Sequence, residues 1–269
     1  MAIITISRQV GSLGDEIAKA VADKLDYEYI EKSKISKILS DLGFSALKVE
    51  KYDEKKPSIW QSLSIQKKKF SHLIRAAVYE LAAKENVVIV GRGGQAILKD
   101  FQGTLHVRVI ASNAARISRL REQMGHDEKN AERIIQQSDH DSSGYIKAYF
   151  DANWDDGDLY DLVINTRTMS LDTGVEMITC AIGANEFKKS PQAFEKLSDL
   201  ALTQKVKSVL LEVSGLTSVI LGVERGVANL SGFAKSETAI KECESAVSKV
   251  KGIIKVNSQI HVVKDDSIL

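Results

Sequence analysis

The stretch that decides the fold is the N-terminal sequence AIITISRQVGSLGDEIAKAVADKL, residues 2–25. Its first part, 2–6, is a continuous apolar run, as expected for a strand that is covered on both faces. Its last part carries apolar side chains at helical spacing, from Ile17 to Leu25. A strand that turns through glycines straight into a helix can bind an anion, because backbone N–H groups and the helix dipole converge there. Residues 7–16 therefore predict a phosphate-binding loop, although an ordinary strand-to-helix turn often has two glycines at this spacing.

Strands and helices alternate along the rest of the N-terminal part. Apolar runs predict buried strands, and helical periodicity predicts helices between them. This alternation implies right-handed crossovers and a parallel sheet. The fold class is therefore α/β, a three-layer sheet with helices on both faces. The predicted strands are 87–90, 105–110 and 162–164, and the predicted helices are about 66–85, 114–123 and 175–182.

A second, smaller domain is predicted after a break near Pro191. The residue before a proline is disfavoured in a helix, and the surrounding sequence KKSPQ is polar, so we expect a linker at about 187–194. Beyond it the pattern reads helix, strand, strand, helix, strand. The expected domains are 1–188 and 195–269, in keeping with a prior of roughly 150 residues per domain.

Composition excludes several classes of protein. The 269 residues include 37 Lys and Arg against 36 Asp and Glu, a net charge of +1, so no global field attracts nucleic acid or an anionic membrane. Two cysteines without a CxxC motif exclude a disulfide framework and argue against a structural zinc site. The sequence shows no signal peptide and no run of about 18 apolar residues that could span a membrane. We therefore expect a cytoplasmic protein.

Three ordered blocks carry a resemblance to a known family. They are residues 4–32, ITISRQVGSLGDEIAKAVADKLDYEYIEK; residues 88–94, VIVGRGG; and Asn153-Trp154 followed by YDLVINT at 160–166. Together they resemble the cytidylate kinase-like family, whose loop typically reads ISRxxGSGGxxIA, over about residues 2–185. The resemblance implies the fold of a P-loop nucleoside monophosphate kinase. It also implies phosphoryl transfer from ATP, with Mg²⁺ carried by the nucleotide and not held in a protein cage, to CMP or a related acceptor.

The resemblance also implies where the substrates bind. Arg92 and Glu31 are expected to bind the acceptor. The alternative interpretation is that Arg92 forms a surface ion pair and that Glu31 is a solvated residue at the start of a helix. The loop residues expected to bind the nucleotide phosphates are Ser7, Arg8, Gly11, Ser12, Gly14 and Asp15.

The loop and the lid depart from the family pattern. Gly14 stands where a Walker loop has its phosphate-binding lysine, and Asp15 stands where this family often has arginine. Asp15 and Glu16 favour the free helix through its dipole but should repel a phosphate. The lid segment 139–145 has no arginine in the expected place, so the substitutes are Arg119, Arg121 and Arg133. Two functions stay open: an active nucleotide kinase, or a degenerate module that senses a nucleotide or phosphorylated metabolite.

The remaining features suggest a partner module and structural residues. Residues 195–265 resemble a BON domain, with glycines at turns 226, 232 and 252. The resemblance implies an unidentified ligand or protein partner and possible homo-oligomerisation. If the protein is a nucleotide sensor, this domain would transmit its signal. The acidic group Asp151, Asp155, Asp156 and Asp158 fits no EF-hand spacing and is interpreted as a solvated lid edge. His106, which alternates with apolar residues in a strand, is interpreted as structural.

Overall fold

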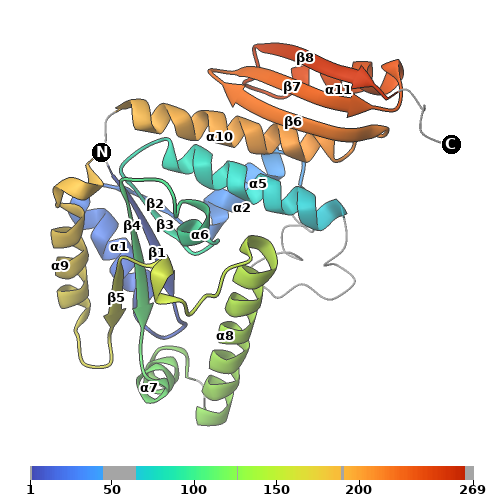
Figure 1. Ribbon diagram of the computed structural model, residues 1–269. Helices are drawn as coiled ribbons and strands as arrows, with labels where there is room; N and C mark the ends of the chain where they lie inside the picture. The colour runs from blue at the N-terminus through green and yellow to red at the C-terminus, as the bar shows by residue number, and fades with distance from the viewer. Residues whose placement is uncertain (1, 45–64, 126, 189–190, 264–269) are drawn as a thin grey trace. The chain divides into compact units, whose positions relative to one another are not determined.

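A computed structural model describes residues 2–44, 65–125, 127–188 and 191–263 of the chain (Figure 1). Contacts group the chain into two compact units. The first spans 1–62 and 84–194, and the second spans 63–83 and 195–269. Each unit has its own sheet and its own apolar core.

The first unit is built on a five-stranded sheet in the order β2-β3-β1-β4-β5. All of its pairings are parallel, and Ile3 on β1 lies between Val87 and Thr104 of the neighbouring strands. The central position of β1 explains why five of its six residues, Ile3 to Ser7, are buried, since a strand lies on each side of it and helices cover both faces. The strands are β1 (Ile3–Arg8), β2 (Glu28–Ile30), β3 (Val87–Val90), β4 (Thr104–Ile110) and β5 (Leu162–Asn165).

Helices cover both faces of this sheet. Helices α1 (Gly14–Leu25) and α9 (Leu171–Ile182) pack against each other and against the core residues Ile4, Ile6 and Val88. A Cβ on Gly174 would lie 2.9 Å from Ile17 Cδ1, so this glycine allows the two helices to approach closely. On the opposite face, helix α6 (Gly94–Ile97) contacts Thr5 and Ile89, whose side chains alternate with those of Ile4 and Val88.

Two of the other helices of the first unit directly follow strands, α2 after β2 and α7 after β4. Helices α7 and α8 pack together over a small apolar cluster of Leu120, Ala131 and Ile135, to which Val10 of the loop adds its side chain. These elements are α2 (Lys32–Asp41), α7 (Asn113–Met124), α8 (Glu128–Phe150) and the short helices η1 (Gly157–Leu159) and η2 (Asn185–Phe187).

The second unit pairs a three-stranded sheet with helices. Strand β6 (Leu216–Glu224) runs antiparallel to β7 (Val227–Ala234), which runs parallel to β8 (Lys255–Val262). Its core includes Val206, Cys243 and Ile260, from α10 (Pro191–Leu210), α11 (Glu237–Ser248) and β8. Helix α5 (Ile65–Ala82) also belongs to this unit.

The grouping of α5 differs from the domains expected from sequence order, which place residues 63–83 with the N-terminal domain. The physical reason is a set of side-chain contacts with the C-terminal part. Lys69 pairs with Glu212 at 2.5 Å, His72 Nδ1 lies 2.8 Å from Gln204 Oε1, and Lys205 pairs with Glu80.

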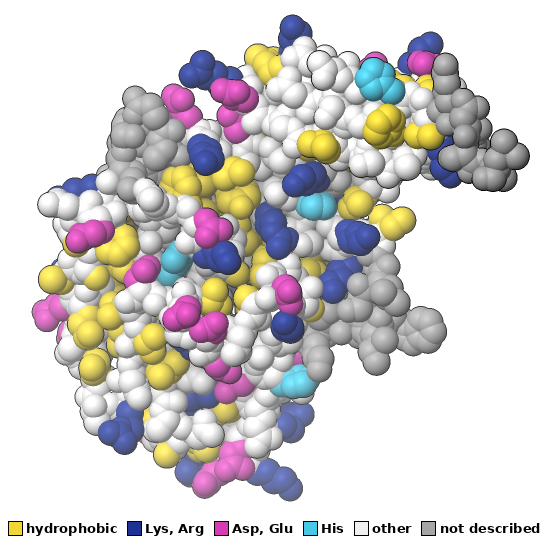
Figure 2. Space-filling model, viewed as in Figure 1, with side chains coloured by type: hydrophobic (Ala, Val, Ile, Leu, Met, Phe, Trp, Pro, Cys, Tyr) yellow, Lys and Arg dark blue, Asp and Glu magenta, His cyan; other side chains and the backbone are white. Residues whose placement is uncertain are grey.

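The five-stranded parallel sheet flanked by helices confirms the α/β part of the predicted fold class. On the face shown in Figure 2, side chains of both charge signs are interspersed, in keeping with the balanced composition. No described helix is long and apolar enough to cross a membrane.

Candidate functional site

The predicted phosphate loop lies where β1 ends and α1 begins. It stands at the carboxyl end of the central strand, between β3 and β4, the place where parallel sheets bind their ligands. Gly11 has a φ of 74° and Leu13 a φ of 63°, so both lie in the left-handed region. Leucine occupies this region at a cost of about 1–2 kcal/mol, which the surrounding structure has to offset.

Three successive carbonyls of the loop are held from outside. The carbonyl of Val10 accepts from Arg116 Nε at 2.7 Å, and that of Gly11 from Arg119 Nη1 at 3.0 Å. The carbonyl of Ser12 accepts from Thr166 Oγ1 at 2.8 Å. In a trans peptide the N–H points opposite to the C=O, so holding the carbonyls outward turns the following N–H groups toward the other side. The Ser12 N–H donates to the Gln9 carbonyl inside the loop at 3.2 Å, so this orientation can serve an anion through the N–H groups of Gly11 and Leu13.

The loop also contains a buried polar atom without a partner. Ser12 is fully buried, and its hydroxyl has no hydrogen bond with any part of the chain that the structure describes. Buried hydroxyl groups in native proteins nearly always have a partner, so an unsatisfied one at a loop of this kind suggests a ligand.

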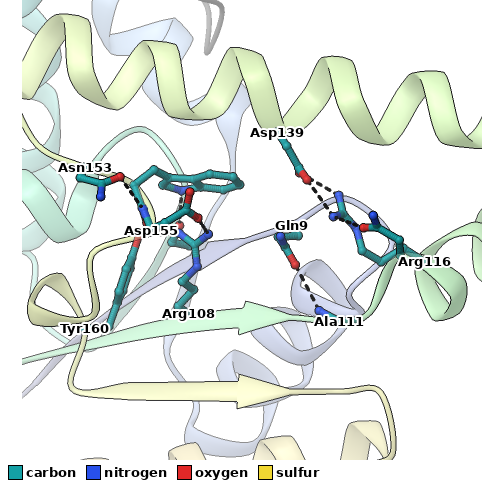
Figure 3. A network of polar contacts seen from close by, with 11 residues as sticks. Gln9, Arg108, Ala111, Arg116, Asp139, Asn153, Asp155 and Tyr160 are labelled. Carbon is teal, nitrogen blue, oxygen red and sulfur yellow. Dashed lines mark hydrogen bonds and ion pairs between the residues drawn. The ribbon is translucent and has the colours of Figure 1, made fainter.

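Arg116 was not among the residues predicted from the sequence. It is 1% exposed and forms a bidentate ion pair with Asp139 of α8, at 2.7 and 2.8 Å (Figure 3). A buried arginine needs such a partner, because removing a charge from water is costly. The pair connects the loop, α7 and α8. The sequence drew attention to Asp139 only as part of the lid.

The three predicted substitutes for the lid arginine lie in different surroundings. Arg119 is engaged beneath the loop, where its second terminal nitrogen donates to the Thr166 carbonyl at 2.6 Å. Arg121 and Arg133 are exposed, and their contacts within the described residues are with Glu128 at 3.7 Å and Asn130 at 3.0 Å. The structure therefore brings Arg119 to the loop and leaves the other two on the surface.

The acidic start of α1 is paired with a loop residue. Arg8 Nε lies 2.8 Å from Asp15 Oδ1, with the two side chains 27% and 58% exposed. The sequence predicts that Asp15 repels an incoming phosphate. The ion pair offsets that charge locally, so the repulsion is weaker than the sequence indicated.

A cavity adjoins the loop on the side of β3. It is lined by Ser7 and Arg8 from β1 and by Arg92 and Gln95 after β3. The other lining residues are Gly91, Gly93, Ser142, Tyr145, Ile146 and Trp154. Arg92 is 1% exposed, so the predicted alternative of a surface position does not hold. It has a φ of 58° between two glycines that also have positive φ, a conformation that turns the chain sharply at the strand end.

Gln95 is a second cavity residue that sequence reasoning missed. It is only 2% exposed and lines the cavity. Its position directly after the GRGG turn was the available signal. Glu31, the other predicted acceptor residue, is exposed at the start of α2 and accepts from Ser33 Oγ at 2.7 Å. It is not among the residues that line the cavity.

The wall of the cavity beside Trp154 is held by a buried cation. Arg108 of β4 donates to the Trp154 carbonyl and pairs with Asp155 at 2.5 Å, while its guanidinium carbon lies 4.2 Å from the indole centre (Figure 3). Trp154 Nε1 in turn donates to Ser7 Oγ at 2.8 Å. Asp155 is therefore part of this network and not only of a solvated edge. The Ser7 hydroxyl is therefore engaged by side chains of this chain, Trp154 and Tyr160.

His106 lies deeper in β4 and has a structural environment, as expected. Its Nδ1 lies 2.7 Å from Thr5 Oγ1, and its backbone N–H donates to Asp161 Oδ2 at 2.7 Å. Burial lowers the pKa of the imidazole below its ordinary value, against the opposing effect of Asp161.

Comparison with known proteins identifies the group to which this geometry belongs. The model of the cytidylate kinase-like family matches residues 3–168, more than half of the chain. The chain belongs to the cytidylate kinase-like family. The matched residues include the loop, the residues that line the cavity, and α8. The family assignment supports a function like that of nucleotide kinases.

Two curated relatives and a solved structure are each similar to about two thirds of the chain. The chain is 27% identical over 190 residues to the cytidylate kinase of Methanococcus aeolicus, covering 69% of this chain and 99% of that protein. It is also 27% identical over 187 residues to the cytidylate kinase of Archaeoglobus fulgidus, covering 69% and 97%. An uncharacterized protein from Eubacterium ventriosum has a similar fold, with a TM-score of 0.54 at 24% identity, covering 69% of this chain and all of that one.

Proposed function

We propose that this chain is an ATP-dependent nucleoside monophosphate kinase that acts on CMP or a closely related acceptor. The observation that carries the proposal is the loop whose three carbonyls are turned outward by Arg116, Arg119 and Thr166. A kinase of this class does most of its work by positioning phosphates and offsetting their charge, which is what such a loop supplies.

The residues present suit the phosphates of a nucleotide. The donors suited to an anion are the start of α1, the N–H groups of Gly11 and Leu13, and the Ser12 hydroxyl, which has no partner among the described residues. Within the described part of the chain, no group of three or more His, Cys, Asp or Glu side chains could hold a metal ion. We propose that Mg²⁺ enters with ATP, where it supplies charge neutralisation of the phosphate oxygens.

The adjoining cavity provides a place for the acceptor. Arg92 is suited to bind the phosphate of the acceptor, and Gln95 presents an amide that can both donate and accept. In the proposed reaction, an oxygen of that phosphate forms a bond with the γ-phosphorus of ATP. The bond from this phosphorus to the bridging oxygen of ADP breaks, and ADP and a nucleoside diphosphate are released.

The second candidate function, a nucleotide sensor without turnover, has two grounds in the sequence: the lid segment 139–145 has no arginine, and α1 starts with acidic residues. The ion pair between Arg8 and Asp15 weakens the argument from the acidic residues, because it offsets the charge of Asp15. We keep residues 1–188 as the proposed nucleotide-binding domain. We propose residues 195–269, with their order of helix, two strands, helix and strand, as a BON-like module for an unidentified ligand or partner.

The test is binding and turnover with a variant of the cavity. Wild-type protein with Mg²⁺ and ATP should convert CMP to CDP, and ATP and CMP should each raise its melting temperature by mass action. Arg92→Ala should weaken CMP binding more than tenfold, because hydrogen bonds to a charged group contribute about 1.5–3 kcal/mol. Lys99→Ala, an exposed change a few residues away, is the control. A change smaller than threefold for Arg92→Ala would argue against its role with the acceptor.

A further inference from the structure

The phosphate loop has glycine at position 14, where a Walker loop has the lysine that reaches the β- and γ-phosphates. The structure shows what fills the space above this glycine. A Cβ built on Gly14 would lie 2.3 Å from Arg8 Cβ and 2.9 Å from Arg8 Cγ. The stem of Arg8 therefore passes directly over the backbone of Gly14, and no larger residue fits there while Arg8 is in place.

Two further contacts fix where Arg8 lies. Its Nε pairs with Asp15 at 2.8 Å, which ties the guanidinium to the first turn of α1. Its side chain also lines the cavity that contains Arg92. Arg8 thus touches both the helix start, where we propose that ATP binds, and the cavity, where we propose that the acceptor binds.

We propose that Arg8, at the end of β1, supplies the phosphate-binding cation that other P-loop kinases take from the loop lysine. In this arrangement Gly14 is small because Arg8 crosses it, and Asp15 orients the guanidinium. The inference rests on the proposed kinase function and assigns the charge that acts on the transferred phosphoryl group. In the resulting site the phosphate-binding cation comes from the end of β1 and not from the start of α1.

The test moves the cation from one position to the other. Because the closest approach is to Arg8 Cβ, the double variant needs glycine at position 8 to make room for a lysine at position 14. Arg8→Gly should lower kcat for CDP formation by roughly 10²-fold, as loss of one preorganised donor does. Arg8→Gly combined with Gly14→Lys should recover at least tenfold of that loss. Arg8→Gly combined with Gly14→Ala is the matched control and should recover nothing, and Lys24→Ala on the exposed side of α1 should behave as wild type.

A second pair of variants keeps the test valid if the glycine variant does not fold. Arg8→Lys keeps a cation and Arg8→Gln removes it at similar length, so kcat should be at least tenfold higher for the lysine variant. Equal rates for these two variants, or no recovery in the double variant, would overturn the assignment of Arg8 while leaving the kinase function intact. A wild-type protein that neither binds ATP with Mg²⁺ nor forms CDP would overturn the proposed function, and this inference with it.

Discussion

Arg116 combines a structural and an electrostatic task in one side chain. It holds the Val10 carbonyl and at the same time forms two hydrogen bonds with Asp139. The arginine is almost fully buried, while Asp139 is 31% exposed. Loss of the guanidinium would leave a half-buried carboxylate without its partner and would release the loop.

Arg116→Met should therefore destabilise the protein by about 3 kcal/mol, at the low end for breaking a buried ion pair because Asp139 retains some contact with water. The measurement is urea unfolding at constant pH. Arg121→Met on the same helix is the matched control, since Arg121 is exposed and its partner is 3.7 Å away. That change should cost less than about 1 kcal/mol. Similar losses for the two variants would show that the pair with Asp139 contributes little.

At this scale the sequence predicts the site in part. The loop and Arg92 are recognisable because their glycines and their place after a strand form a local pattern. Arg116 and Thr166 are not recognisable as loop supports, because their contacts join residues 106 and 154 positions apart. Gln95 was missed because an amide next to glycines has no distinctive signature until the cavity it lines is known. The pairing of Arg8 with Asp15 depends on the rotamers of two side chains, which no spacing rule gives.

Strand β4 places an ionisable side chain inside the sheet. Burial lowers the pKa of His106 in the folded protein below its ordinary value of about 6.5. The unfolded chain then binds more protons than the folded one in the range around and below this value. Stability consequently rises with pH through this range and falls on acidification.

We expect the free energy of unfolding to decrease between about pH 7.5 and pH 5.5, and part of this slope to disappear in His106→Asn. Asparagine can still offer a hydrogen-bonding atom to Thr5 but has no proton to gain. Urea unfolding over a series of pH values measures the effect. His72, whose pKa burial also lowers, should account for part of the remaining slope. An unchanged slope in His106→Asn would show that this histidine is not responsible, and exposed His140→Asn is the control.

Most elements with strong periodicity lie where the sequence predicts them. The helix predicted at about 66–85 is Ile65–Ala82, and the strand predicted at 87–90 is Val87–Val90. The elements that were not predicted have weaker signals. Helix α6 has only one turn, β2 has three residues, and α8 is a mostly polar helix that buries only a few side chains. Propensity alone does not define such segments, because their stability comes from tertiary contacts.

At the scale of the whole molecule, α5 lies in the N-terminal part of the sequence but groups by its contacts with the C-terminal part. A fragment of residues 1–188 retains the five-stranded sheet and the clamped loop but lacks Gln204, Lys205 and Glu212, which contact α5. We expect this fragment to unfold cooperatively and to bind ATP. We also expect residues 65–82 to exchange their amide hydrogens much faster than in the full chain.

Hydrogen exchange followed by mass spectrometry gives this comparison peptide by peptide. Peptides from β1, α1 and α7 serve as internal controls, because their partners remain in the fragment. Full protection of α5 in the fragment would show that α10 is not needed to stabilise it. An unfolded fragment would contradict the proposed boundary between the domains.

The grouping of α5 with the C-terminal part also has a consequence for the newborn chain on the ribosome. Glu80 and its partner Lys205 are 125 residues apart. At about 5–20 residues per second, the ribosome needs roughly 6–25 s to supply that partner after α5 has been made. During this interval α5, with its long apolar stripe, has emerged while the helix that completes its packing has yet to be translated. The nascent protein should therefore need protection from aggregation by chaperones mainly while residues 81–205 are being added, in the middle part of its synthesis.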